Sequence, residues 1–180
     1  TGALHTTPQF LEWLKLVKDR RQSGASKNIP LTIIDRPQTI KLGETLELKI
    51  IYPLKSLAGQ SVANLNNSSI VFKLIYGQTT FLFMGDAEKE VEDELMASGV
   101  PLQADVLKVG HHGSSDATSE EFLKIVSPQF AVIEVGRGND FGHPSGRTIK
   151  KLERIGARIF RTDLDGTIRL KSDGEKIEVD

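Results

Sequence analysis

Leu-Phe-Met-Gly-Asp at 82–86 and Leu-Lys-Val-Gly-His-His-Gly-Ser at 107–114 are the two stretches that decide how this 180-residue sequence folds. Each is an apolar run typical of a buried strand, and each ends abruptly in side chains that bind metal ions. These side chains are Asp86 in the first stretch and the adjacent His111 and His112 in the second. Because hydrolytic metal centres are built from carboxylate and imidazole ligands, the two stretches indicate such a centre.

Strands and helices alternate along the chain from these stretches onward. The apolar patterns predict strands at 80–84, 105–109, 130–135, 158–161 and 167–170, with helices around 87–95, after an N-cap at Thr118, and over 145–155. Such alternation predicts an α/β fold with a largely parallel sheet, in which ligands bind at the carboxyl ends of the strands. Asp86, His111, His112 and the loop carrying His143 all follow strand ends, so we expect them at one edge of the sheet.

The first half of the chain has a different pattern, with one helix followed by several strands. A helix is predicted to start at Thr7-Pro8 and to end in a loop at 22–26, followed by strands at 31–34, 39–42, 46–52 and 70–76. Gly77-Gln78 predicts a hairpin turn into the strand at 80–84. The polar stretch 56–68 is predicted to be a loop.

Composition limits the classes of function. The net charge is -1, so an anionic polymer such as DNA would be held by a local patch or a metal ion. The absence of cysteine excludes disulfides, thiolate zinc sites and cysteine nucleophiles. No apolar run approaches the roughly 20 residues that span a bilayer, and no signal peptide is visible. Because the sequence opens at Thr1-Gly2, we expect a processed product or an excised fragment.

Each candidate site residue also has a plain structural interpretation. Asp86 could cap the helix that follows it, and His111 and His112 could be a packed, hydrogen-bonded pair. Gly113 would let the loop turn tightly, and Ser114 could hold it through a local hydrogen bond.

The loop residues farther from this pair leave the same alternatives open. His143 could be an exposed loop histidine or a donor that faces the substrate. Asn66, Asn67 and Ser69 could be ordinary turn formers. Among the arginines, Arg137 is the best candidate for a phosphate contact because it lies in the His143 loop, although solvated charge is the simpler role. The acidic run 88–94 is most simply the solvent face of its helix.

These motifs together resemble the ComEC-type metallo-β-lactamase-fold domain, the C-terminal domain of the DNA-uptake channel of competent bacteria, which also occurs as stand-alone hydrolases. The resemblance is carried by the blocks at 66–69, 85–88, 104–114, 142–144 and 161–166. It implies an αββα sandwich with two divalent ions, zinc or manganese, at one edge of the sheets. It also implies that Asp86 bridges the metals, that one of His111 and His112 is a ligand while the other faces substrate, and that His143 and the loop of Asn66, Asn67 and Ser69 lie close to the site.

One block of the family is absent from this sequence. The family's principal metal-binding pattern, His-x-His-x-Asp-His, does not occur, and His5 is the only histidine before His111. We therefore expect residues 1–180 to be the C-terminal portion of a single domain that lacks its N-terminal half, with weak metal binding and little turnover on its own. The missing half and self-association are the expected partners.

The resemblance implies a metal-dependent phosphodiesterase or nuclease that acts on DNA during competence-related uptake. It would lie on the extracytoplasmic face of the bacterial membrane if it belongs to a ComEC-like protein. Two alternatives remain open at this point: a hydrolase of small esters or amides on the same fold, and a non-catalytic module that binds DNA or a partner through an incomplete site.

Overall fold

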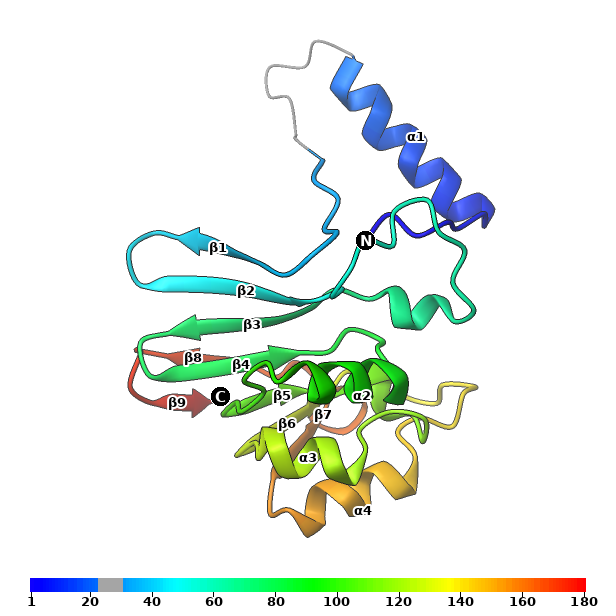
Figure 1. Cartoon of the computed structure of the whole chain (residues 1–180). Coiled ribbons are helices and arrows are strands. Elements are labelled where there is room, and N and C mark those ends of the chain that lie inside the picture. The colour runs from blue at the N-terminus through cyan, green and yellow to red at the C-terminus, as the bar shows by residue number, and fades with distance from the viewer. Residues whose placement is uncertain (23–30) are drawn as a thin grey trace.

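A seven-stranded mixed sheet forms the centre of the computed structural model, which describes residues 1–22 and 31–180 (Figure 1). In spatial order its strands are β1 (Gln38–Leu42), β2 (Leu46–Tyr52), β3 (Val71–Tyr76), β4 (Thr79–Phe83), β5 (Val106–Lys108), β6 (Phe130–Ile133) and β7 (Arg158–Arg161). Strands β1 to β4 pair antiparallel, and β4 to β7 pair parallel. The parallel half confirms the sheet predicted from the alternation of strands and helices, and it puts the carboxyl ends of β4, β5 and β6 at one edge.

Three helices cover one face of the parallel part of this sheet: α2 (Lys89–Ser98), α3 (Glu120–Val126) and α4 (Gly146–Arg154) (Figure 1). Their apolar side chains, such as Leu95, Phe122 and Leu152, pack with Leu82 of β4 and Leu107 of β5 in one buried cluster. All five of these side chains are fully buried. This face holds the main core of the domain.

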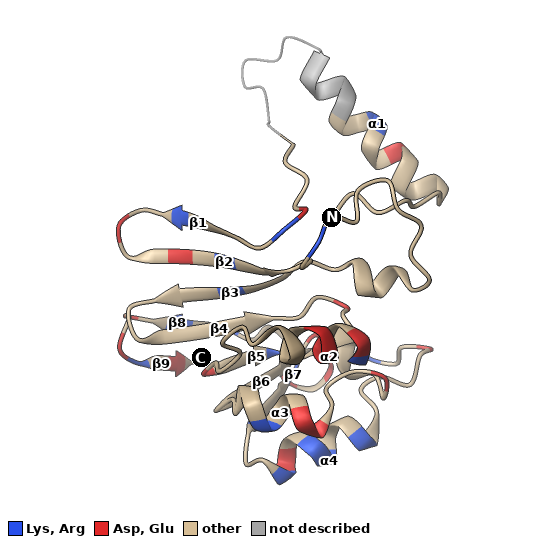
Figure 2. Ribbon diagram, viewed as in Figure 1, with Lys and Arg blue, Asp and Glu red and all other residues tan. Residues whose placement is uncertain are grey.

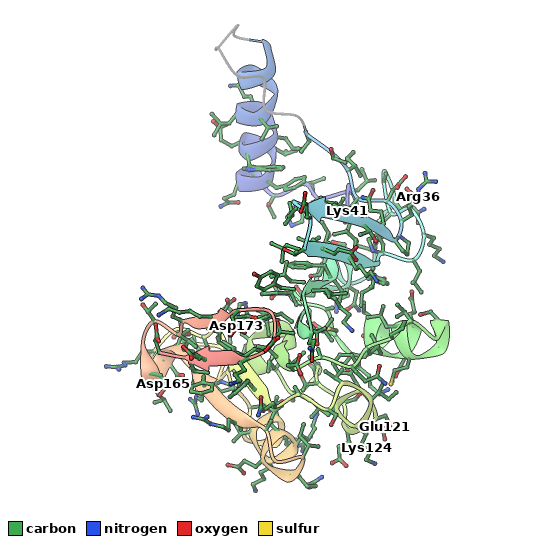
Figure 3. The ribbon with its side chains drawn as sticks, turned by 90° about the vertical axis from the view of Figure 1, so that its left-hand side faces the viewer. Arg36, Lys41, Glu121, Lys124, Asp165 and Asp173 are labelled. Carbon is green, nitrogen blue, oxygen red and sulfur yellow. The ribbon has the colours of Figure 1, made fainter. Side chains whose placement is uncertain are left out.

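The opposite face of the sheet is only partly covered. The hairpin of β8 (Leu170–Ser172) and β9 (Ile177–Val179) packs over Val106, Phe130 and Val132. Figure 3 shows this hairpin, near the labelled Asp173, on the side of the sheet away from α3 with Glu121 and Lys124. Beside the hairpin, a groove of about 480 Å³ remains open, lined mainly by apolar side chains of β2 to β6.

Two further α-helices lie outside this layered core. Helix α1 (Pro8–Gln22) extends away from the sheet (Figures 1 and 3), and its Leu11, Trp13 and Leu16 are about half exposed. The short α5 (Thr162–Asp165) follows β7 directly. Within the part of the chain that the structure describes, no helix is both long enough and apolar enough to cross a bilayer.

Most predicted elements are present, with three corrections. Residues 31–34 do not form a strand, and the last predicted strand lies later, at β8. Helix α3 is capped by the Ser119 hydroxyl, which accepts the Phe122 N–H, rather than by Thr118. The predicted loop at 22–26 lies, from residue 23 on, outside the described residues.

Candidate metal-binding site

The structure brings Asp86 and three histidines to the carboxyl edge of the parallel strands. Asp86 follows β4, His111 and His112 lie in the tight turn Gly110–Gly113 shortly after β5, and His143 lies in the loop between β6 and α4. The Asp86 Oδ1 and His112 Nε2 atoms are 3.4 Å apart. The ring centroids of His111 and His143 are 5.4 Å apart, and those of His111 and His112 are 6.3 Å apart. Residues spread over more than fifty positions thus meet at one edge.

The turn that carries the two histidines has an unusual backbone. His111 and His112 have φ values of 43° and 52°, and Gly113 has a φ of 79°. The left-handed region costs a residue with a Cβ about 1–2 kcal/mol, so the surrounding structure must hold this turn in place. At Gly113 a Cβ atom would lie 2.7 Å from the Cβ of Pro144, which only glycine avoids. The close contact between Gly113 and Pro144 packs the His143 loop against the histidine turn.

His112 is oriented by a backbone carbonyl. Its Nδ1 atom lies 2.7 Å from the Glu134 carbonyl oxygen. A carbonyl oxygen only accepts, so Nδ1 carries the proton, and in the neutral ring Nε2 presents a lone pair toward Asp86. Two acceptors, an imidazole nitrogen and a carboxylate oxygen, then face each other at 3.4 Å, with both side chains about two-fifths exposed. A proton or a metal ion between them would satisfy both groups.

His111 is held by a different set of partners. Its buried Nδ1 atom lies 3.0 Å from Glu88 Oε1 but makes no hydrogen bond in this geometry. Its Nε2 atom lies 3.3 Å from the side-chain amide nitrogen of Asn66. The Asn66 and Asn64 amides also donate to the two oxygens of Glu88, each at 2.8 Å. Glu88 therefore connects the Asn-rich loop with the histidine turn.

The remaining loop residues hold Asp86 and the start of α2. The Ser69 hydroxyl accepts the Asp86 N–H at 3.0 Å. The Asn67 side-chain oxygen accepts the Glu88 N–H at 2.9 Å, and its amide donates to Glu90 at 3.1 Å. Each of these side chains bonds to the protein itself, and these bonds fix the position of the Asp86 turn.

The other predicted site residues lie around the His143 loop. The Ser114 hydroxyl accepts the Asp116 N–H at 3.2 Å, which is the local hydrogen bond expected for it. Arg137 is exposed, and its Nε donates to the Asp163 carbonyl oxygen at 3.1 Å. Arg137 therefore shares this loop with His143, but its Nε contacts a carbonyl oxygen and not the histidines. Burial, together with the neighbouring His111 and His112, lowers the pKa of His143.

Two residues of the site were missed from the sequence. Glu88 belongs to the acidic run interpreted as a solvent face, but its side chain is only 12% exposed. Lys108, on the partly covered face at the end of β5, donates to the Gly85 carbonyl oxygen at 2.9 Å, and its ammonium lies 4.0 Å from Glu134. Burial lowers the pKa of Lys108. Glu88 lies two residues after Asp86 and Lys108 three residues before His111, and this closeness to predicted ligands was the signal available in the sequence.

The donor set fits a divalent metal ion only in part. Asp86 and His112 supply two convergent donors, while His111 is engaged with Glu88 and Asn66. A catalytic zinc usually has three protein ligands. Among residues 1–22 and 31–180, no group of three or more histidine, aspartate or glutamate side chains could hold a metal ion. These residues therefore provide part of a ligand set and do not complete a metal site by themselves.

Comparisons with known proteins agree with this arrangement of strands and motifs. Residues 7–136 match the family model described as the metallo-beta-lactamase superfamily. ComE operon protein 3 of Bacillus subtilis is 38% identical over 135 residues, which cover 74% of this chain and 17% of that protein. Competence protein ComA of Neisseria gonorrhoeae is 34% identical over 105 residues, 58% of this chain and 15% of that protein.

Recombination protein 2 of Haemophilus influenzae is also similar, with 32% identity over 114 residues, 63% of this chain and 14% of that protein. The chain thus spans between 14% and 17% of the length of these three curated relatives. The similarity concerns one segment of much longer proteins.

Proposed function

Because the chain belongs to the metallo-beta-lactamase superfamily, we propose that it is part of a metal-dependent hydrolase that cleaves phosphodiester bonds in DNA. Proteins with this fold generally bind divalent metal ions and are usually hydrolases. The relatives ComE operon protein 3 and Competence protein ComA support a competence-related role. Such a role supports DNA as the substrate.

The observation that carries the proposal is the approach of Asp86 to His112. The backbone carbonyl of Glu134 turns Nε2 of His112 toward the Asp86 carboxylate, and both groups are accessible to solvent. Metal-binding histidines commonly donate their second ring N–H to a carbonyl or a carboxylate in this way. We assign Asp86 and His112 as metal ligands, and His111 and His143 as the imidazoles closest to the reacting atoms.

The remaining ligands would come from polypeptide outside this chain, since the described residues complete no metal site. Zinc and manganese are the proposed ions, two in the complete protein. The same incomplete set favours a second candidate, a non-catalytic module that binds DNA or a partner. The two candidates differ in whether Asp86 affects hydrolysis.

The test measures hydrolysis of linear DNA and of bis(p-nitrophenyl) phosphate, with zinc and with manganese. It uses this chain and a version extended at its N-terminus by any residues that its gene encodes before Thr1. We expect little turnover by the chain alone and metal-dependent cleavage by the extended protein. Replacing Asp86→Asn or His112→Ala should reduce that cleavage at least 100-fold, because each change removes a ligand.

Asp93→Asn is the matched control. Asp93 is an exposed carboxylate on α2 that pairs with Lys89 at 2.7 Å, away from the histidines. This variant should cleave both substrates like the parent. Cleavage that survives in Asp86→Asn would reject the assignment, and absence of cleavage in every version, together with retained DNA binding, would favour the non-catalytic module.

A further inference from the structure

Phe141 presents its ring to solvent beside the candidate site. Its side chain is 81% exposed, the highest value among the large hydrophobic side chains of the described residues. It lies in the loop between β6 and α4 and borders a hollow of about 370 Å³ that His112 and His143 also line. A single exposed apolar side chain is common on protein surfaces. Here, however, the exposed ring belongs to the same hollow as two of the site's imidazoles.

The loop that carries Phe141 is built by hydrogen bonds. The Asn139 side-chain amide donates to the carbonyl oxygens of Gly136 at 3.0 Å and of His143 at 2.7 Å. Its side-chain oxygen accepts the N–H groups of Phe141 at 3.2 Å and His143 at 3.1 Å. The half-buried Asn139 side chain thus holds the backbone of both Phe141 and His143.

The rings of the loop form a row that leads into the site. The Phe141 ring lies nearly parallel to the His143 imidazole, with an interplanar angle of 20° and a centroid separation of 6.0 Å. The His143 ring in turn lies 5.4 Å from that of His111, edge to face. The Phe141 ring therefore lies beside the two imidazoles, His143 and His111, that are assigned to the reaction.

We propose that Phe141 and His143 form a nucleobase-binding subsite, on which a base of a single-stranded polynucleotide stacks. This inference rests on the proposed function and names the strand form of its substrate. Stacking on an aromatic side chain contributes about 1–3 kcal/mol per base and tolerates any sequence, because every base has a π face. A base within a duplex is already stacked on both sides, so an accessible platform selects single strands.

The charge of the molecule supports stacking as the means of holding the substrate. The net charge is -1, and Figure 2 shows acidic residues along α2 and at the start of α3, with basic residues on α4 and scattered over other elements. Proteins that hold nucleic acid by its backbone alone neutralise several phosphates with lysine and arginine. Because the chain carries no net positive charge, an aromatic contact to a base would supply affinity that does not depend on salt.

The test measures binding of a fluorescent oligothymidylate by the full chain in the presence of a chelator, so that hydrolysis plays no part. We expect Phe141→Ala to weaken binding about 5- to 150-fold, which corresponds to the loss of one stacked base. Phe141→Trp and Phe141→Tyr should stay within threefold of the parent, because they keep a π face. Phe141→Leu should behave like the alanine variant, which separates stacking from simple apolar contact.

Two controls complete the experiment. Leu42→Ala removes a half-exposed apolar side chain at the opposite end of the sheet and should leave binding unchanged. An abasic oligonucleotide should bind the parent as weakly as oligothymidylate binds Phe141→Ala. Equal binding by the parent and Phe141→Ala, equal binding of abasic and normal strands, or no binding by the parent would each overturn the subsite. The role of Asp86 in hydrolysis is decided by the separate cleavage assay, so failure of the subsite can be distinguished from failure of the proposed function.

Discussion

The two faces of the central sheet are made from the same strands but end in different environments. On β4, Leu82 points to the helices and is fully buried, whereas its neighbours Phe81 and Phe83 point to the other face and are only half-buried. At the edge of that second face, Leu42 of β1 remains 47% exposed. Alternation along a strand decides which face a side chain joins, but the covering elements decide whether it leaves water.

The difference shows where the stability of the chain resides. The helix-covered face has three helices over it, and the second face has only the short β8–β9 hairpin over Val106, Phe130 and Val132. The core side chains under the helices are fully buried, so substitutions of them should remove transfer free energy and leave cavities. Substitutions on the second face should cost less, because the lost contacts are partly replaced by water.

The largest expected effect comes from Leu82→Ala on the helix-covered face. Because Leu82 is fully buried, its truncation should lower the free energy of unfolding by about 2–5 kcal/mol. Leu42→Ala, the same change on the other face, should cost about 0.5 kcal/mol or less. Urea denaturation followed by circular dichroism measures both. Equal losses would break the comparison, and a loss at Leu42 that depends on protein concentration would show that another copy covers the second face.

A smaller effect is expected from the carboxylate that links α2 to α3. Glu92 is fully buried, and its two oxygens accept the N–H groups of Thr118 and Ser119 at the start of α3. Glu92→Gln offers one acceptor for these two donors, so it should lower the free energy of unfolding by about 1–3 kcal/mol. This variant sharpens the comparison between the two faces because it tests how α2 and α3 are held to each other over the first face.

The same variant predicts a dependence on pH. Burial raises the pKa of Glu92 above its ordinary value, and the hydrogen bonds from Ser119 and Thr118 oppose the shift in part. A folded-state pKa above the unfolded one stabilises the fold fully below the unfolded pKa, and this contribution is lost as the pH rises through the folded pKa. The difference in free energy of unfolding between the parent and Glu92→Gln should therefore decrease as the pH rises above 4.5, the ordinary pKa of a glutamate. The control is Glu94→Gln, exposed on the same helix, which should stay within about 0.5 kcal/mol of the parent. If the loss of stability in Glu92→Gln grew with pH, the raised pKa assigned to Glu92 would be contradicted.

Much of the fold could be predicted because local patterns agree with tertiary structure where strands are apolar and turns contain glycine. The hairpin at Gly77-Gln78 and the strand at 46–52 are examples. The prediction fails at 31–34, where an apolar run has the pattern of a strand but finds no strand to pair with. It also fails at Thr118, where φ is 60° and the next residue takes the cap. Pairing partners and backbone strain depend on residues far away in the sequence.

The location of the candidate site could be predicted from the sequence, but the contacts between its residues could not. Strand ends predict that Asp86 and the histidine pair share an edge, since topology alone requires it. The sequence does not show that Glu88 turns inward, because an acidic run on a helix has the same pattern whether it faces solvent or a neighbouring loop. The distinct supports of His111 and His112, a carboxylate and a backbone carbonyl, likewise depend on the left-handed turn. The roles of these residues stay predictions.

The smallest expected effect concerns a ring pair on the partly covered face. Phe72 of β3 and Phe83 of β4 are direct register partners, and their rings stack with centroids 4.6 Å apart at 14°. A double-mutant cycle with Phe72→Leu and Phe83→Leu should give a coupling of about 0.5–1.5 kcal/mol, the range for aromatic pairs. A coupling near zero would mean that this face adds nothing beyond simple burial. A coupling of several kcal/mol would mean that the pair is as enclosed as the helix-covered core, and the contrast between the two faces would then be lost.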